Sequence, residues 1–372
     1  MSVCEDAISV NSLDFDKKIR QNWEKERKPY SALFELTPKC NMDCVHCYLQ
    51  DRHGDAYLST DEIKKIIDVL CEAGILFLTL TGGEILTRKD IKDIYMYAKK
   101  KGFFVELFTN LTLLDDEMVS ILNEYPPLIV DVSLYGASED TYYRVTGLQG
   151  VYDRVTNNIQ KLHDNNIRVA LKCPVITISK NEMEKMKTFA DSLGVPIRFT
   201  YEIINTIDGD STPTAYQLDI KSALEMEFAQ YVRIDTSMIK KKGKDVGSYE
   251  ENVVNRDCLF RCNVGKGSLM IDYTGKMAPC MKLRHKGVKL SSENFNDIWK
   301  SFYVYSEMQA KKDYKCKTCK HSKYCDLCPA EMERLYGDAN YIDESECKKS
   351  LAREMFYDDH KLMEEIFVSV GI

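Results

Sequence analysis

The number and spacing of its cysteines constrain this chain more than any other feature. Eleven of its fourteen cysteines fall into two groups, three at positions 40–47 and eight between 258 and 347. Such cysteines serve either a disulfide framework or metal ligation. The N-terminus lacks the basic start and apolar run of a signal peptide, so we expect a cytoplasmic protein. Thiols stay reduced in that compartment, which favours metal ligation.

Composition narrows the class of protein further. Hydrophobic residues make up 44% of the 372 residues and charged residues 29%, which is typical of a globular chain. No stretch approaches the roughly 18 consecutive apolar residues that a membrane span needs. We expect neither a membrane nor a nucleic-acid partner. The length suits one large domain and a smaller one.

Short apolar runs alternate with helical periodicity over the first two thirds of the chain. Six such strands, each followed by a helical pattern, indicate βα units around a parallel sheet. The predicted fold is α/β, a partial (β/α)6 TIM-like barrel followed by a small cysteine-rich iron–sulfur domain. The strands are predicted at 32–37, 76–80, 103–109, 128–134, 167–173 and 197–203, and the main helices at 60–72, 115–123, 151–164, 180–193 and 218–239.

The pattern changes after Lys244, where strong strand signals end and cysteines accumulate. Four segments are therefore expected. They are an N-terminal arm at 1–30, the barrel at 31–245, a domain with two auxiliary clusters at 246–350, and a C-terminal helix at 351–372.

The first cysteine group follows the first predicted strand. Cys40, Cys44 and Cys47 have the spacing C-x3-C-x2-C. Three thiolates so close together can bind three irons of a cubic 4Fe–4S cluster and leave the fourth iron open for substrate chemistry. A zinc knuckle that lacks one ligand is the alternative.

This spacing, together with Gly82-Gly83-Glu84 at the end of the second strand, resembles the radical S-adenosylmethionine (SAM) superfamily. The resemblance implies that Cys40, Cys44 and Cys47 are the catalytic cluster ligands. In that family the open iron chelates SAM, and an electron splits SAM to methionine and a 5′-deoxyadenosyl radical. Both motifs lie at the C-terminal ends of strands, where βα barrels place their active sites.

The resemblance also implies SAM contacts. His46 would pack by the adenine, Glu84 and its glycines would hold the methionine ammonium, Ser133 would contact the ribose, and Arg144 would pair with the methionine carboxylate. A purely structural role is the alternative for Ser133, Arg144 and Asn110. The full set of expected cofactor-binding residues is His46, Tyr48, Gly82, Gly83, Glu84, Asn110, Ser133 and Arg144.

The second cysteine group resembles the SPASM domain of radical SAM enzymes that modify peptides. Its core is Cys316-x2-Cys319-x5-Cys325-x2-Cys328, whose last gap is one residue shorter than usual. The resemblance implies two interleaved sets of four ligands, and two zinc sites are the alternative. The nearer auxiliary cluster would use Cys258, Cys262, Cys280 and Cys328, and the farther one Cys316, Cys319, Cys325 and Cys347. The cofactors are then three 4Fe–4S clusters and SAM.

Three cysteines remain outside these groups. Cys71 continues the apolar face of its helix and is expected in the core. Cys4 lies in the N-terminal arm. Cys173 ends the fifth strand, where it either packs in the core or donates a hydrogen atom in catalysis.

The function that these motifs favour is maturation of a ribosomally made peptide by an oxidative cross-link, either a thioether or a C–C bond. An anaerobic sulfatase-maturing type of enzyme is the runner-up, but Met281 stands where that type carries an Asp after the cysteine. A non-catalytic iron–sulfur electron carrier is a third hypothesis. An external electron donor of the flavodoxin or ferredoxin type and a separate leader-recognition protein are the expected partners.

Charge is distributed unevenly along the chain. Residues 261–323 contain fourteen Lys and Arg against five Asp and Glu, although the whole chain has a net charge of −7. These cations either compensate thiolate-bound metal or bind an acidic peptide leader. For the second use we expect Lys282, Arg284 and Lys286 to form an exposed turn.

Overall fold

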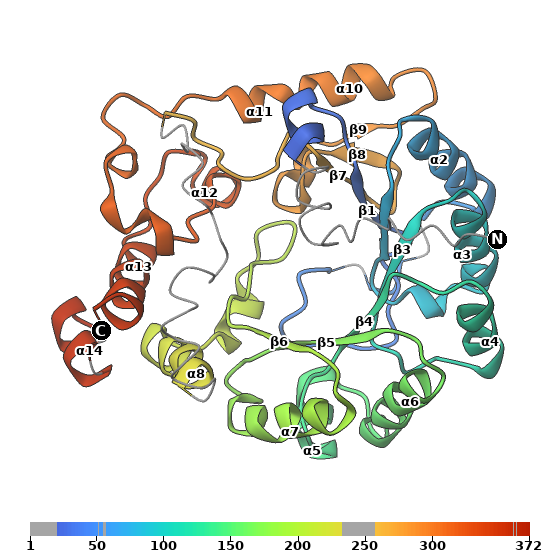
Figure 1. Ribbon diagram of the computed structural model, residues 1–372, viewed down its shortest axis with the longest axis horizontal. Coiled ribbons are helices and arrows are strands. Elements are labelled where there is room, and N and C mark those ends of the chain that lie inside the picture. The colour runs from blue at the N-terminus through green and yellow to red at the C-terminus, as the bar shows by residue number, and fades with distance from the viewer. Residues whose placement is uncertain (1–20, 51, 55–56, 233–256, 360, 362) are drawn as a thin grey trace, which may run out of the picture.

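The structure is a computed structural model that describes residues 21–50, 52–54, 57–232, 257–359, 361 and 363–372. Cys4 and the predicted boundary at 245–246 lie outside the described residues. The described strands form one sheet in the order β6-β5-β4-β3-β2-β1-β7-β8-β9. Helices cover the outside of the curved β1–β6 part of this sheet (Figure 1). No helix in the described ranges is long and apolar enough to cross a membrane.

The first six strands confirm the predicted partial barrel, because each pairs in parallel with its neighbour. The elements are β1 (Ser31–Glu35), α2 (Thr60–Glu72), β2 (Phe77–Thr81), η1 (Ile85–Thr87), α3 (Ile91–Lys100), β3 (Phe104–Thr109), α4 (Asp116–Glu124), β4 (Ile129–Ser133), α5 (Glu139–Thr146), α6 (Tyr152–Asp164), β5 (Val169–Pro174), η2 (Lys180–Glu182), α7 (Met183–Leu193) and β6 (Ile197–Thr200). Helix α5 was not predicted.

Local sequence explains why these elements form. Ser59 caps α2 in a capping box with Glu62, and the apolar positions of α2 at helical spacing turn toward the sheet. In β3, Val105 and Leu107 are buried against the helices, while Glu106 and Phe108 alternate onto the other face of the sheet. The main core therefore lies between the sheet and the outer helices.

Three short strands that the sequence did not predict follow the point after Lys244 where strong strand signals end. Strand β7 (Ser268–Ile271) pairs in parallel with β1, and β8 (Lys276–Ala278) and β9 (Val288–Lys289) continue the sheet as antiparallel strands. These strands are only 4, 3 and 2 residues long, too short to show an alternating pattern. The second part of the chain is thus joined to the barrel by backbone hydrogen bonds.

The expected single helix at 351–372 is two helices, and the first begins earlier than predicted. Helix α13 (Glu344–Tyr357) contains Cys347, and α14 (Met363–Val370) follows. The remaining elements are η3 (Thr212–Tyr216), α8 (Ile220–Val232), η4 (Met281–Lys286), α10 (Phe295–Ser301), α11 (Tyr303–Glu307), η5 (Lys315–Lys317), η6 (Lys320–Tyr324) and α12 (Pro329–Tyr336).

Helix α13 packs against α8, the last described helix before the cysteine-rich part. The rings of Phe228 and Phe356 stack at 4.0 Å between centroids. Beside them Arg353 Nε donates to Glu227 Oε1 at 2.9 Å. The cysteine-rich part therefore curves from β9 back to α8, as Figure 1 shows.

A buried ion pair also joins the two parts of the chain. Arg284 of η4 donates from Nη1 and Nη2 to the two carboxylate oxygens of Glu35, at 3.1 and 2.8 Å. The side chains are 10% and 0% exposed. Burial raises the pKa of Glu35, and the charge of Arg284 opposes that rise.

The basic turn expected to be exposed at 282–286 is exposed only at its end, because Lys282 and Arg284 are largely buried. Lys282 is 20% exposed and lies 3.3 Å from Glu202 Oε1. Lys286 is 44% exposed and lies 3.0 Å from Glu333 Oε1. Acidic side chains of this chain pair with all three cations, because η4 packs between the barrel and α12.

We predict that Arg284→Ala lowers the free energy of unfolding by about 3 to 5 kcal/mol, because the substitution leaves the Glu35 carboxylate buried without its cation. Lys286→Ala is the control, since its half-exposed pair contributes at most about 1 kcal/mol. Urea unfolding of both variants at matched iron content measures the difference. Equal losses for the two variants would show that the buried pair does not hold the domains together.

Candidate active site

The loop after β1 holds the first cysteine group in a closed conformation. Cys47 N–H donates to the carbonyl oxygen of Cys44 at 3.1 Å, and Cys40 N–H donates to that of Arg52 at 3.0 Å. Arg52 Nη1 in turn donates to the Cys44 carbonyl at 3.1 Å. Arg52 thus closes the loop from its far end, a role that sequence reasoning missed because nothing in the cysteine spacing points to it.

Burial determines the protonation of these thiols. It raises the pKa of Cys40 to about 12, and it raises those of Cys44 and Cys47 as well. The Cys47 thiolate raises the pKa of Cys40 and Cys44 further, Asp43 raises that of Cys47, and Arg52 lowers all three. Thiolates are the metal-binding form, so metal binding here is coupled to proton release.

The two glycines at the end of β2 allow its backbone to touch the start of the cysteine loop. A Cβ at Gly82 would overlap the Thr37 carbonyl oxygen, and one at Gly83 would overlap those of Pro38 and Lys39. In this close approach Gly83 N–H donates to the Thr37 carbonyl at 2.8 Å. The glycine pair therefore fixes the loop that carries Cys40. Its predicted contact with the SAM ammonium stays a prediction.

Glu84 is fully buried beside this contact. Its Oε1 accepts from Thr109 Oγ1 at 2.6 Å and from Leu86 N–H at 2.9 Å, and its Oε2 accepts from Asn110 N–H at 2.6 Å. Burial raises the pKa of Glu84, and these hydrogen bonds lower it. The ends of β2 and β3 are thus joined through one carboxylate.

Asn110 extends this network to the cysteine loop. Its Nδ2 donates to Asn41 Oδ1 at 3.0 Å and lies 4.0 Å from Cys40 Sγ. Its Oδ1 accepts from Thr112 N–H at 3.0 Å. The structure therefore brings together Glu84, Asn110 and Cys40, and a SAM-binding role for the first two remains a prediction.

His46 lies on the side of the loop that faces β4. Its Nδ1 is buried without a hydrogen-bond partner. Burial lowers the pKa of His46 to about 4, so the ring is neutral at pH 7. Its ring centroid is 5.4 Å from that of Tyr135, whose hydroxyl hydrogen-bonds Cys44. Tyr135 was missed in the sequence, although an aromatic residue just after a barrel strand was a usable signal.

The remaining predicted SAM contacts lie at different places. Ser133 ends β4 opposite Lys172 of β5. Tyr48 donates to Glu35 Oε1 at 3.3 Å and so joins the Glu35–Arg284 pair. The Arg144 side chain is 55% exposed and lies 3.6 Å from Asp140 on the same helix.

Helix α5 nevertheless touches the cysteine loop through its backbone. Val45 N–H donates to the Val145 carbonyl at 2.9 Å, and Asp43 N–H donates to that of Thr146 at 2.8 Å. Arg144 thus belongs to a helix that packs on the loop, while its side chain points to Asp140. Its pairing with a methionine carboxylate stays a prediction.

Three of the four cysteines predicted for the nearer cluster, Cys262, Cys280 and Cys328, lie close together. Burial, and then the neighbouring Cys328 thiolate, raise the pKa values of Cys262 and Cys280. Cys280 precedes η4 and Cys328 precedes α12, so two short helices position these thiols. The backbone of Cys258 forms a bridge to Gln309.

The farther cysteines form a separate neighbourhood. Burial raises the pKa of Cys347 first, and the thiolates of Cys316, Cys325 and Cys319 raise it further. Cys316 is likewise influenced by Cys325 and Cys319. This grouping contains all four members of the predicted farther set, whereas the nearer grouping contains three of its predicted four, and the ligand assignment itself stays a prediction.

The donor set fits iron–sulfur clusters chemically, because each neighbourhood supplies several thiols. No group of three or more His, Cys, Asp or Glu side chains within the described ranges converges on one point as ligands of a single metal ion would. A cubic cluster takes one thiolate per iron, so its ligands need not converge in that way.

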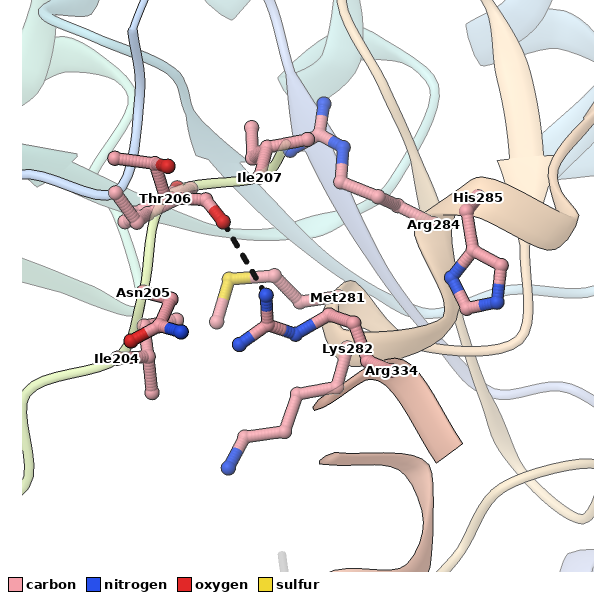
Figure 2. A pocket seen from close by; sticks show the side chains of 10 residues that line it. Ile204, Asn205, Thr206, Ile207, Met281, Lys282, Arg284, His285 and Arg334 are labelled. Atoms are coloured by element: carbon pink, nitrogen blue, oxygen red, sulfur yellow. Dashed lines mark hydrogen bonds between the residues drawn. The ribbon is translucent and has the colours of Figure 1, made fainter. Parts of the chain in front are cut away.

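A pocket lies between the barrel and the cysteine-rich part. Figure 2 shows the side chains of Met281 and Lys282 beside the segment 204–207. Arg334 Nη1 donates to the Thr206 carbonyl at 3.2 Å across this pocket. Its lining consists of Tyr48, Ile204, Asn205, Thr206, Ile207, Met281, Lys282, Arg284, His285 and Arg334.

The two leftover cysteines in the described part of the chain lie away from this site. Cys71 is partly buried on α2 and packs against the main core. Cys173 is 0% exposed, and its Sγ lies 3.3 Å from Met186 Sδ on the helix side of β5. This position favours core packing for Cys173 over hydrogen-atom donation.

Comparison with known proteins gives two family matches. Residues 34–192 match the radical SAM superfamily, and residues 262–326 match SPASM, an iron–sulfur cluster-binding domain.

Curated relatives resemble most of the chain. An AdoMet-dependent heme synthase of Methanosarcina barkeri is 28% identical over 85% of this chain and 95% of its own length. The antilisterial bacteriocin subtilosin biosynthesis protein AlbA of Bacillus subtilis is 28% identical over 81% of this chain and 65% of its own.

Solved structures at low sequence identity share the fold. Streptococcus suis SuiB bound to its precursor peptide SuiA gives a TM-score of 0.67 at 15% identity, covering 93% of this chain and 83% of that one. The protein anSMEcpe with bound AdoMet gives 0.68 at 14% identity, covering 92% of this chain and 99% of that one.

We predict that Glu84→Gln weakens SAM binding about tenfold or more, because it removes the charge complementary to an ammonium and turns an amide NH2 toward donors. Equilibrium binding of SAM at constant iron content measures this. Glu117→Gln, on a 73% exposed side chain, is the matched control. Unchanged SAM affinity would leave Glu84 only its structural role, and Arg144→Ala tests the carboxylate contact in the same way.

Proposed function

Because the chain belongs to the radical SAM superfamily and carries a C-terminal SPASM domain, we propose that it is a cytoplasmic peptide maturase. It installs an oxidative cross-link, a thioether or a C–C bond, in a ribosomally made peptide. One observation carries the proposal. The three-cysteine loop, joined to Glu84 through Asn110, lies at the strand ends of a barrel that also carries two further cysteine neighbourhoods.

We propose three 4Fe–4S clusters as cofactors. Cys40, Cys44 and Cys47 hold the first, with an open iron for SAM. The nearer auxiliary cluster uses Cys258, Cys262, Cys280 and Cys328, and the farther one uses Cys316, Cys319, Cys325 and Cys347. When bound, the first cluster and SAM supply hydrogen-atom abstraction, and the fully ligated clusters supply electron transfer.

The chain's own residues position this chemistry. Arg52 and the Gly82-Gly83 contact hold the cysteine loop from both ends. The neutral His46 ring, with its unpartnered Nδ1, offers a hydrogen-bonding edge beside Tyr135 for a nucleoside base. Tyr48, Glu35 and Arg284 connect the loop to the segment after Cys280, so the first and nearer auxiliary sites keep a fixed relation.

The proposed substrate class rests on the relatives. AlbA is named for bacteriocin biosynthesis, and SuiB is described with a bound precursor peptide. The pocket between the barrel and the cysteine-rich part is lined by residues 204–207 on one side and by Met281, Lys282 and Arg334 on the other.

Leader recognition needs a surface other than the one first expected. Lys282 and Arg284 are largely buried in ion pairs within the chain, which leaves only Lys286 of the three exposed and gives little support to a site for an acidic leader. A separate leader-recognition protein, and an electron donor of the flavodoxin or ferredoxin type, complete the proposed system.

Tetrapyrrole modification is the second candidate. The heme synthase relative is matched along 95% of its length, more than AlbA. The sulfatase-maturing hypothesis has less support, because Met281 lines the pocket where that type of enzyme is expected to carry an Asp.

Turnover with defined substrates tests the proposal. We expect 5′-deoxyadenosine formation to rise with a short peptide encoded beside this gene, and the peptide to lose two hydrogens by mass spectrometry. The Cys40→Ala, Cys44→Ala, Cys47→Ala triple variant is expected to lose all SAM cleavage but keep the C-terminal cluster spectra, while Cys71→Ala stays active. Turnover of an iron-bound porphyrin carboxylate, with none of peptide, would favour the second candidate.

Cluster number is tested separately. Three 4Fe–4S clusters predict about twelve irons per chain after anaerobic reconstitution, and about eight in the triple variant. Iron and sulfide analysis measures both. A total near four, or stoichiometric zinc, would contradict the two auxiliary clusters.

A further inference from the structure

The face of the sheet opposite the helices carries charged side chains inside the barrel. Cross-strand pairing places Phe108 beside Asp131 and Lys172 beside Arg198. Alternation along β3, β4 and β5 turns Leu107, Val132 and Leu171 to the helix side instead, where they are buried. We call Glu106, Asp131, Lys172 and Arg198 the inner belt.

Only one oxygen of Asp131 is used within this belt. Lys172 Nζ lies 2.6 Å from Asp131 Oδ2 and 2.9 Å from the centre of the Phe108 ring. Arg198 Nη2 lies 3.7 Å from the same Oδ2. Asp131 is 9% exposed, and its Oδ1 is buried without a hydrogen-bond partner.

An unpaired buried carboxylate oxygen is costly, and native structures rarely contain one. The missing partner must donate, because a carboxylate only accepts. Beside it, the Arg198 side chain is 64% exposed and has several N–H groups for an acceptor. The site therefore suits a ligand that presents one donor and one acceptor side by side.

An extended peptide segment has this arrangement, because the N–H and C=O of one residue point to the same side. A carboxylate does not, since it only accepts and would lie against Asp131 and near Glu106. A porphyrin carboxylate is therefore disfavoured here.

We propose that Asp131 and Arg198 clamp the backbone of the substrate peptide inside the barrel. The N–H of one extended residue donates to Asp131 Oδ1, and its C=O accepts from Arg198. Lys172 holds Oδ2 and thereby orients the carboxylate. This clamp rests on the proposed peptide substrate, and it identifies the peptide backbone as the part that the barrel binds.

A SAM ribose hydroxyl is the other source of a donor. Ser133, the predicted ribose contact, lies two residues beyond Asp131 on the same face of β4, about 7 Å further toward the strand end. Asp131 thus lies deeper in the barrel, and the experiment separates the two sources by adding SAM.

The probe is N-acetylalanine N-methylamide. Its comparison ligand is O-acetyl-lactic acid N-methylamide, in which an ester oxygen replaces the alanine N–H. Ligand-observed NMR with the reconstituted enzyme, its clusters oxidised, gives both dissociation constants. We expect the diamide to bind about tenfold more tightly than the ester analogue, with and without saturating SAM.

Two variants assign the two halves of the clamp. In Asp131→Asn the amide carbonyl takes the position of Oδ2, because Lys172 can only donate a hydrogen bond. The amide NH2 then takes the position of Oδ1 and cannot accept from the probe. We therefore expect the preference for the diamide to be lost. In Arg198→Gln both probes weaken equally, because both carry the carbonyl. Asp116→Asn, on an exposed carboxylate paired with Lys161, is the control and keeps the preference.

Several results overturn the clamp. Failure of the diamide to bind at all is one, and equal binding of both probes, which would show that water alone satisfies Oδ1, is another. A preference for the diamide that survives in Asp131→Asn would also overturn the clamp. So would loss of diamide binding when SAM is added. Arg198→Gln decides the carbonyl contact even if Asp131→Asn fails to fold, since unchanged affinities in it remove that contact. A preserved clamp without peptide turnover would instead refute only the proposed function.

Discussion

Strand β1 is the element on which the rest of the structure depends, because it is the strand that joins the barrel to the strands of the cysteine-rich part. It pairs in parallel with β2 on one side and with β7 on the other. Ala32 and Phe34 are fully buried on its helix-facing side. A shift of one residue would turn these side chains to the wrong face, so its register is strongly determined. The cysteine loop therefore starts from a fixed point shared by the barrel and the cysteine-rich part.

The central position of β1 buries the charged residue at its end. Glu35 is the last residue of the strand, and with no exposure it requires a cation and hydrogen-bond donors. Arg284 and Tyr48 supply them, one from each side of the junction. The excess of cations at 261–323 thus serves the interior in part. This cation excess, which is typical of a docking surface, here includes Arg284, whose ion pair joins the barrel to the cysteine-rich part.

Burial and thiol chemistry are linked across the molecule. The cysteines beside the barrel have raised pKa values chiefly because they are buried, and the same holds for Cys280 and Cys347. Thiols in such surroundings gain their ligand form when a metal binds, so folding of these loops and metal binding stabilise each other. The short 3-10 helices around the second group, which have few internal hydrogen bonds, are consistent with that dependence.

Sequence alone determined the features that depend on neighbours along the chain. The βα alternation was predicted because apolar periodicity is visible within a few residues, and the first cysteine motif because its three members lie in one loop. Sequence interpretation failed where a strand was too short to show a period, or where two interacting residues were far apart in the sequence. Strands of 2 to 4 residues show no period, and the buried state of Arg284 depends on Glu35, which is remote in sequence.

Tertiary structure decided which distant groups meet. It placed Cys262 and Cys280 near Cys328, closed the cysteine loop with Arg52, and left one oxygen of Asp131 without a partner. No local pattern encodes these contacts. They arise because parallel pairing brings strand ends to one edge of the sheet, and because only packing fixes which polar atom loses access to water.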